Sequence, residues 1–107
     1  MSSPASLVAT RFGANLAAAR RRAGFSQEEV GVRASLHRTE IGLLERGERV
    51  PRIDTAVKLA GSVGVSLDEL LAGIEWAPGM ARRGEFVSAA QDGPASRQGV
   101  APTVGRP

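Results

Sequence analysis

The chain has no cysteine and no tyrosine, and only one histidine, one tryptophan and three phenylalanines among its 107 residues. Without cysteine it can have no disulfide framework, no thiolate metal site and no cysteine nucleophile. A single histidine, His37, does not supply the ligands of a conventional zinc site. We therefore expect the protein to bind no metal and no cofactor.

Long hydrophobic runs are also missing. No stretch approaches the roughly 18 consecutive apolar residues that a membrane-spanning helix needs. Residues 1–11 contain neither a basic leader nor a long apolar segment, which predicts that no secretory signal is present. We expect a cytoplasmic protein without a membrane partner, built as one modest domain or as a small domain with a tail.

The charge balance is less basic than the isoelectric point suggests. The isoelectric point is about 11.0, yet the formal net charge is only +3. Lys58 is the only lysine beside thirteen arginines, and with tyrosine and cysteine absent almost nothing titrates between neutrality and the high pKa of arginine. Nucleic-acid binding must therefore be judged from where the charges lie rather than from their sum.

Composition divides the chain near residue 74. Residues 14–71 are rich in Leu, Val, Ala, Glu and Arg at helical spacing, whereas residues 75–107 contain five glycines and four prolines. We predict an N-terminal arm with the start of the first helix (1–11), a folded domain (12–73) and a flexible, largely disordered tail (74–107). Three locations are open for Trp76: a short hairpin at 75–88, a docked position on the helical core, or a dimer interface.

The helix boundaries are marked by capping residues. Ser26 with Glu29, and Ser66 with Glu69, form the pattern of a capping box, and His37 stands at a third cap position. Glycines that can end the preceding helices follow at 24, 47 and 64. These signals predict an all-α domain with helices at 8–23, 27–34, 38–46, 54–63 and 67–73.

The apolar residues at helical spacing predict the core. On the second and third helices the inward residues are Val30, Ala34, Leu36, Ile41 and Leu44. The core is expected to be closed from the other side by Ile53, Val57, Leu59 or Ala60, Val63, Leu67, Leu70 and Leu71.

The helices at 27–34 and 38–46, joined by residues 35–37, have the outline of a helix-turn-helix. Three segments, GFSQEEV (24–30), LHRTEI (36–41) and LERGERVP (44–51), closely resemble the Cro and lambda-repressor-like (XRE) helix-turn-helix family. Leu59-Ala60 and VGVSLDELL (63–71) resemble the last two helices of that family. The resemblance covers about residues 12–73 and implies a five-helix lambda-repressor-like DNA-binding domain. Gly31 stands where the family usually has alanine, and Ser35 replaces a glycine often seen in the turn.

The resemblance also implies roles for individual residues. Helix 38–46 is expected to be the recognition helix in the major groove of double-stranded DNA, with an outward Gly42 and with base contacts from His37, Arg38, Thr39 and Leu43. Phosphate contacts are expected from Gln27, Arg46, Arg49 and Arg52, although each arginine can also be a solvated surface residue. Arg20 and Glu45 resemble the partly buried ion pair of the family.

Three of these positions have a second interpretation. Leu43 either meets thymine methyl groups or folds onto the surface of the domain. Glu40 either accepts a hydrogen bond from cytosine N4 or, as we favour, folds back onto the backbone N–H of His37 as a capping partner. His37 itself serves either as a cap or as a neighbour of DNA.

These features favour a sequence-specific DNA-binding transcriptional regulator that binds as a homodimer, because one recognition helix buries little surface. The sequence has no paired acid and base residues, phosphate loop or metal site, so we expect no enzyme. The alternative is a protein-interaction module, or an antitoxin or controller-type protein that holds a protein partner with the same fold. Its support is Glu40, Gly42 and Leu43, which make the recognition surface less basic.

Overall fold

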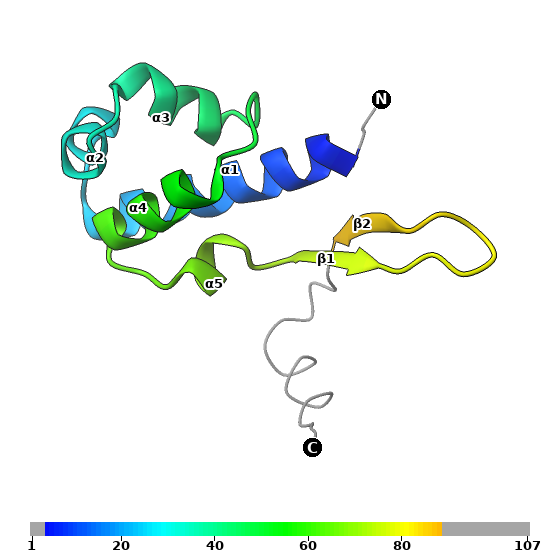
Figure 1. The fold of residues 1–107 in the computed structure, drawn as a ribbon. Helices are drawn as coiled ribbons and strands as arrows, with labels where there is room; N and C mark the ends of the chain where they lie inside the picture. Colours follow the sequence, from blue (N-terminus) through cyan, green and yellow to red (C-terminus); the bar gives the residue numbers. More distant parts are fainter. Residues whose placement is uncertain (1–3, 89–107) are drawn as a thin grey trace.

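The structure of the chain is a computed structural model that describes residues 4–88. It contains five helices followed by a two-stranded antiparallel sheet (Figure 1): α1 (Pro4–Ala23), α2 (Gln27–Ala34), α3 (Arg38–Glu45), α4 (Ile53–Val63), α5 (Leu67–Leu70), β1 (Ile74–Ala77) and β2 (Glu85–Ser88). The predicted five-helix fold is confirmed. Helix α1 begins earlier than predicted, at a proline, which is tolerated in the first turn of a helix. The part of the predicted tail beyond residue 88 lies outside the described residues. None of the helices between residues 4 and 88 is long and apolar enough to cross a membrane.

The first predicted capping box is confirmed, and the second forms only in part. Ser26 Oγ accepts a hydrogen bond from the Glu29 N–H at 3.0 Å, and Glu29 Oε1 accepts one from the Ser26 N–H at 2.7 Å. Ser66 Oγ likewise accepts from the Glu69 N–H at 3.2 Å, but the Glu69 carboxylate pairs with Arg22 of α1. A guanidinium is a stronger partner for a carboxylate than a backbone N–H.

The core lies between the five helices. Its largest fully buried side chains are Phe12, Leu16, Val30, Ile41, Leu44, Leu59 and Leu70. The predicted inward position of Ile53 and Val57 is wrong, because these side chains are 72% and 55% exposed. Helix α4 turns a stripe of Ala56, Leu59, Ala60 and Val63 inward, as predicted for Val63 and for Leu59 or Ala60. Leu71 is also exposed, since it follows the end of α5.

Helices α1 and α3 approach each other closely at Gly13. A Cβ atom on Gly13 would lie 2.2 Å from the carbonyl oxygen of Leu44 and 2.8 Å from that of Glu45. No side chain fits there without moving one of the two helices. The absence of a side chain at Gly13 therefore allows the last turn of α3 to lie directly against α1.

The structure contains the hairpin that was one of the alternatives for Trp76. Strands β1 and β2 pair so that Trp76 lies opposite Phe86, and the two rings meet edge to face with their centroids 4.9 Å apart. The hairpin is tied to α1 because Arg11 Nη2 donates a hydrogen bond to Ser88 Oγ at 2.7 Å. Nearby, Asn15 Nδ2 of α1 donates to the carbonyl oxygens of Leu70 and Ala72 and so caps the end of α5. In Figure 1, α2 and α3 lie on one side of α1, and α5 and the hairpin lie on the other.

Candidate nucleic-acid interface

The turn between α2 and α3 is tight. Ser35 adopts a left-handed conformation with φ of 59°, and the Leu36 N–H donates a hydrogen bond to the Gly31 carbonyl at 2.8 Å. A Cβ atom on Gly31 would lie 2.7 Å from the Leu36 carbonyl oxygen and 3.3 Å from the Arg38 nitrogen. A methyl group at residue 31 would therefore require the turn to move slightly away from α2.

The imidazole of His37 begins helix α3. Its Nδ1 atom accepts a hydrogen bond from the backbone N–H of Thr39 at 3.0 Å, as an N-cap side chain does. The exposed side chain leaves Nε2 available for contact with a ligand. His37 thus fixes the start of α3, where Arg38 and Thr39 are both exposed.

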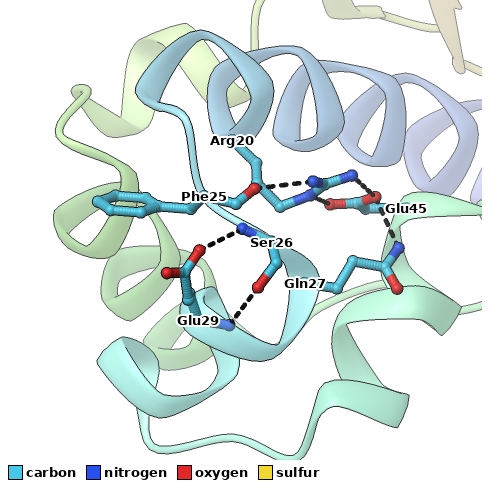
Figure 2. A network of polar contacts seen from close by, with 6 residues as sticks. All are labelled: Arg20, Phe25, Ser26, Gln27, Glu29 and Glu45. Atoms are coloured by element: carbon cyan, nitrogen blue, oxygen red, sulfur yellow. Dashed lines mark hydrogen bonds and ion pairs between the residues drawn. The ribbon is translucent and has the colours of Figure 1, made fainter.

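One buried carboxylate joins three helices, as Figure 2 shows. Arg20 Nε and Nη2 of α1 donate to the two oxygens of Glu45 at 2.5 and 3.0 Å, and Arg20 Nη1 donates to the Phe25 carbonyl at 2.9 Å. Gln27 Nε2 of α2 donates to Glu45 Oε1 at 2.9 Å. The Arg20 and Glu45 side chains are only 12% and 5% exposed. The hydrogen bond to Glu45 raises the pKa of Arg20, while burial acts in the opposite direction.

This network changes the expectation for Gln27. Its amide nitrogen, expected to meet a phosphate, is already committed to Glu45 at the start of α2. In the free protein the side chain therefore orients α2 against α3. The N-terminal N–H groups of α2 provide a separate donor set at the same place.

The outer surface of α3 is formed by side chains of its successive turns. Thr39 is exposed and Leu43, four residues later on the same side of the helix, is half-buried. Gly42 was expected to face outward, but it is buried. Arg46 Nη1 lies 3.0 Å from the place where a Gly42 Cβ would be, so the guanidinium of Arg46 covers the backbone there.

The favoured prediction for Glu40 is wrong. Its carboxylate does not fold back onto His37, because Glu40 Oε1 accepts a hydrogen bond from Arg49 Nη1 at 2.6 Å. Imidazole already caps the helix, and the guanidinium offers the carboxylate a charged partner. This contact joins the first turn of α3 to the segment that follows the helix.

The remaining arginines of the predicted interface are also paired with carboxylates. Arg46 Nε lies 2.9 Å from Glu48 Oε2, and Arg52 Nε lies 3.4 Å from Asp54 Oδ1. The hydrogen bond to Glu48 raises the pKa of Arg46, and the same contact lowers the pKa of Glu48. Arg46, Arg49 and Arg52 are all exposed: Arg46 ends α3, Arg49 reaches back to Glu40 in the first turn of α3, and Arg52 precedes α4.

Several contacts at this site were not predicted. The Arg33 guanidinium lies 4.4 Å from the ring centre of Phe25, and its Nε donates to the Ser62 carbonyl, which joins α2 to α4. Glu28 of α2 faces Arg38 at 3.7 Å. The Glu28–Arg38 contact could have been predicted from the sequence, because the two residues stand in the first turns of two helices that a short turn joins. Within residues 4–88, no cluster of three or more His, Cys, Asp or Glu side chains could hold a metal ion.

The five-helix arrangement and the tight α2–α3 turn define a helix-turn-helix domain. The family model HTH_3, described as helix-turn-helix, matches residues 16–70, and the chain belongs to this family. An uncharacterized HTH-type transcriptional regulator, y4dJ of Sinorhizobium fredii (strain NBRC 101917 / NGR234), is 42% identical over 59 residues, which are 55% of this chain and 77% of that protein.

Solved structures show the same fold. The restriction-modification controller protein C.AhdI from Aeromonas hydrophila is 33% identical, with a TM-score of 0.56 over 57% of this chain and 92% of its own. The P22 c2 repressor protein in complex with a synthetic operator is 26% identical, with a TM-score of 0.55 over 58% of this chain and 94% of its own. The resemblance to the Cro and lambda-repressor-like family is confirmed.

Proposed function

We propose that this chain is a sequence-specific DNA-binding transcriptional regulator that inserts α3 into the major groove of double-stranded DNA. The observation that carries the proposal is the start of α3, where exposed Arg38 and Thr39 project from a helix held by the buried Glu45 network. A rigid support of this kind is what base reading requires, because hydrogen bonds to base edges tolerate little displacement. The proposed regulator works in the cytoplasm and is not an enzyme.

The side chains of α3 supply the proposed base contacts. Arg38 can donate two parallel hydrogen bonds to O6 and N7 of guanine, and Thr39 can contact a thymine methyl group. Leu43 lies on the same side of the helix as Thr39 and extends the apolar contact by one turn. His37 reaches the DNA through Nε2, since Nδ1 caps the helix.

Phosphate contacts are proposed on both sides of α3. The N-terminus of α2, with Gln27, offers backbone N–H groups and the positive end of the helix dipole to one phosphate. Arg46, Arg49 and Arg52 offer guanidinium groups to the other strand. These contacts fix the position of the helix and carry no sequence information themselves.

The proposed active form is a homodimer. Helix α3 has only eight residues, so a single copy reads few base pairs. Two copies related by a twofold axis read two half-sites about one helical turn apart, roughly 34 Å. The solved complex of the P22 c2 repressor with operator DNA supports DNA as the partner of this fold.

Selection of bound sequences from a pool of randomised duplexes tests this proposal. We expect enrichment of a motif with two related half-sites centred about 10 base pairs apart. Binding without enrichment of any sequence contradicts the proposed sequence-specific function. Sedimentation of the same complex then gives the number of protein copies bound to each duplex.

A protein-interaction module is the second candidate, and two observations favour it. Leu43 is half-buried on the surface of α3, and the neighbouring arginines are all paired with carboxylates. A controller or antitoxin-type protein would use this surface to hold another protein. DNA binding falls steeply with salt concentration, whereas an apolar contact centred on Leu43 would hardly respond.

A further inference from the structure

The surface proposed to bind DNA carries its own counter-charges. Each of its four arginines lies within ion-pair distance of a carboxylate of the same chain: Arg38–Glu28 at 3.7 Å, Arg46–Glu48 at 2.9 Å, Arg49–Glu40 at 2.6 Å and Arg52–Asp54 at 3.4 Å. We refer to these eight residues as the paired surface. Its four positive and four negative groups leave it without net formal charge, although the whole chain carries +3.

This neutrality bears directly on DNA affinity. Non-specific binding to DNA comes almost entirely from cations that replace counterions at phosphates. An arginine held by a carboxylate must leave that partner, or share it, before it can bind a phosphate. The paired surface is therefore poor at binding DNA by charge alone, and more of its affinity must come from base contacts.

The Glu40–Arg49 pair differs from the other three. Glu40 is 26% exposed, whereas Glu28, Glu48 and Asp54 are all more than half exposed. It is also the only acidic partner that belongs to α3 itself, so its charge lies on the helix proposed to enter the groove. Partial burial reduces the screening of this pair by water and salt. Glu40 is thus the least exposed of the four carboxylates, and it makes the shortest contact with its arginine.

We propose that Glu40 limits non-specific DNA binding by holding Arg49 in an ion pair that phosphates must break. This inference rests on the proposed DNA-binding function. Glu28, Glu48 and Asp54 act in the same way on their own arginines, with smaller effects because they are more exposed. Low non-specific affinity matters for a regulator because a genome offers a very large excess of competing sites.

Glu40→Gln tests the inference, because it removes the charge and keeps the size of the side chain. The matched control is Glu69→Gln, which changes net charge equally and releases Arg22 from α5, the helix that lies across α1 from α3 in Figure 1. Binding of the full chain to a random-sequence duplex of about 20 base pairs is measured by fluorescence anisotropy from roughly 50 to 200 mM salt. A urea titration of each variant first establishes that it is folded.

We expect Glu40→Gln to bind the random duplex roughly 5–10-fold more tightly at 50 mM salt, since it gains about one phosphate contact. The slope of log affinity against log salt concentration should steepen by about one. Glu69→Gln should change both quantities much less. Glu40→Asp, which keeps the charge, should bind like the wild-type protein.

The outcomes separate this inference from the proposed function. Equal changes in Glu40→Gln and Glu69→Gln, or none in either, with measurable wild-type binding, overturn the role of Glu40 and leave DNA binding intact. Failure of the wild-type protein and of every folded variant to bind any duplex at 50 mM salt overturns the proposed function and this inference together. A gain confined to Glu40→Gln supports the role of Glu40 and the use of this surface to bind DNA.

Discussion

At the scale of single residues, Glu45 has the largest structural role near the proposed interface. Its two oxygens accept hydrogen bonds from Arg20 of α1 and Gln27 of α2, while Glu45 itself ends α3. A buried ion pair contributes little when compared with an apolar pair, but it is costly to break by removing one partner. Loss of Glu45 would leave the Arg20 guanidinium buried without a counter-charge.

Glu45→Ala should therefore lower the free energy of unfolding by roughly 3–5 kcal/mol in a urea titration. Glu48→Ala removes a carboxylate from an exposed arginine and should barely move the unfolding midpoint. Similar losses in the two variants would show that the Glu45 network does not hold the helices together.

The two glutamates of α3 also show what sequence can predict about single residues. The Arg20–Glu45 pair was expected because both residues fit the pattern of a known family. The partner of Glu40 was not expected, because Arg49 lies nine residues away in a segment without helical periodicity. Local capping rules could suggest only a backbone partner for Glu40.

At the scale of elements, the starts of α2, α3 and α5 were predictable because capping is local. Ser26, His37 and Ser66 each cap the helix that follows, as predicted, with a side-chain acceptor for a nearby N–H. The inward position of Val63 and of Leu59 or Ala60 was predicted, but the apolar residues of α4 cover a wide arc, and periodicity did not exclude Ile53 and Val57 from the core. The outcome is that Ile53 and Val57 lie outside the core.

The close approach of α1 and α3 at Gly13 gives a prediction with a sharp control. Gly13→Ala should destabilise the protein by about 1–3 kcal/mol or more, because the added methyl group would overlap the Leu44 carbonyl. Gly61→Ala is the same chemical change in α4, where nothing lies within 4 Å of the new atom. That variant should be more stable by roughly 0.5–1 kcal/mol.

Thermal unfolding of the two variants measures the difference. Opposite shifts in Tm, downward for Gly13→Ala and upward for Gly61→Ala, are expected. An upward shift in both variants would mean that intrinsic helix propensity, and not the contact between α1 and α3, governs Gly13.

At the scale of the whole molecule, the hairpin extends the domain on the side of α1 away from α3. It is anchored by the Arg11–Ser88 hydrogen bond and by Ile74, which packs against the core. Composition suggested a flexible tail here because residues 75–107 contain five glycines and four prolines. The pairing of Trp76 with Phe86 depends on contacts that no local pattern fixes.

Phe86→Leu should remove the edge-to-face contact and destabilise the hairpin by about 0.5–1.5 kcal/mol. Trp76 is the only tryptophan, so its emission reports this directly and should shift to longer wavelength. Met80→Leu alters an exposed side chain in the same hairpin and should leave the emission unchanged. An unchanged spectrum in Phe86→Leu would contradict the ring contact.

The proposed function depends on α3 reading DNA sequence through its exposed first turn. The most direct test compares Arg38→Ala with Arg21→Ala. The second variant removes an exposed arginine of α1 and changes the net charge by the same amount. Fluorescence anisotropy measures each variant on the selected duplex and on a shuffled duplex from about 50 to 200 mM salt. We predict that Arg38→Ala lowers the ratio of the affinities for the selected and shuffled duplexes roughly 5- to 150-fold, equivalent to 1–3 kcal/mol. Arg21→Ala should leave this ratio unchanged. Retention of the full preference by Arg38→Ala, or equal losses in the two variants, would contradict the claim.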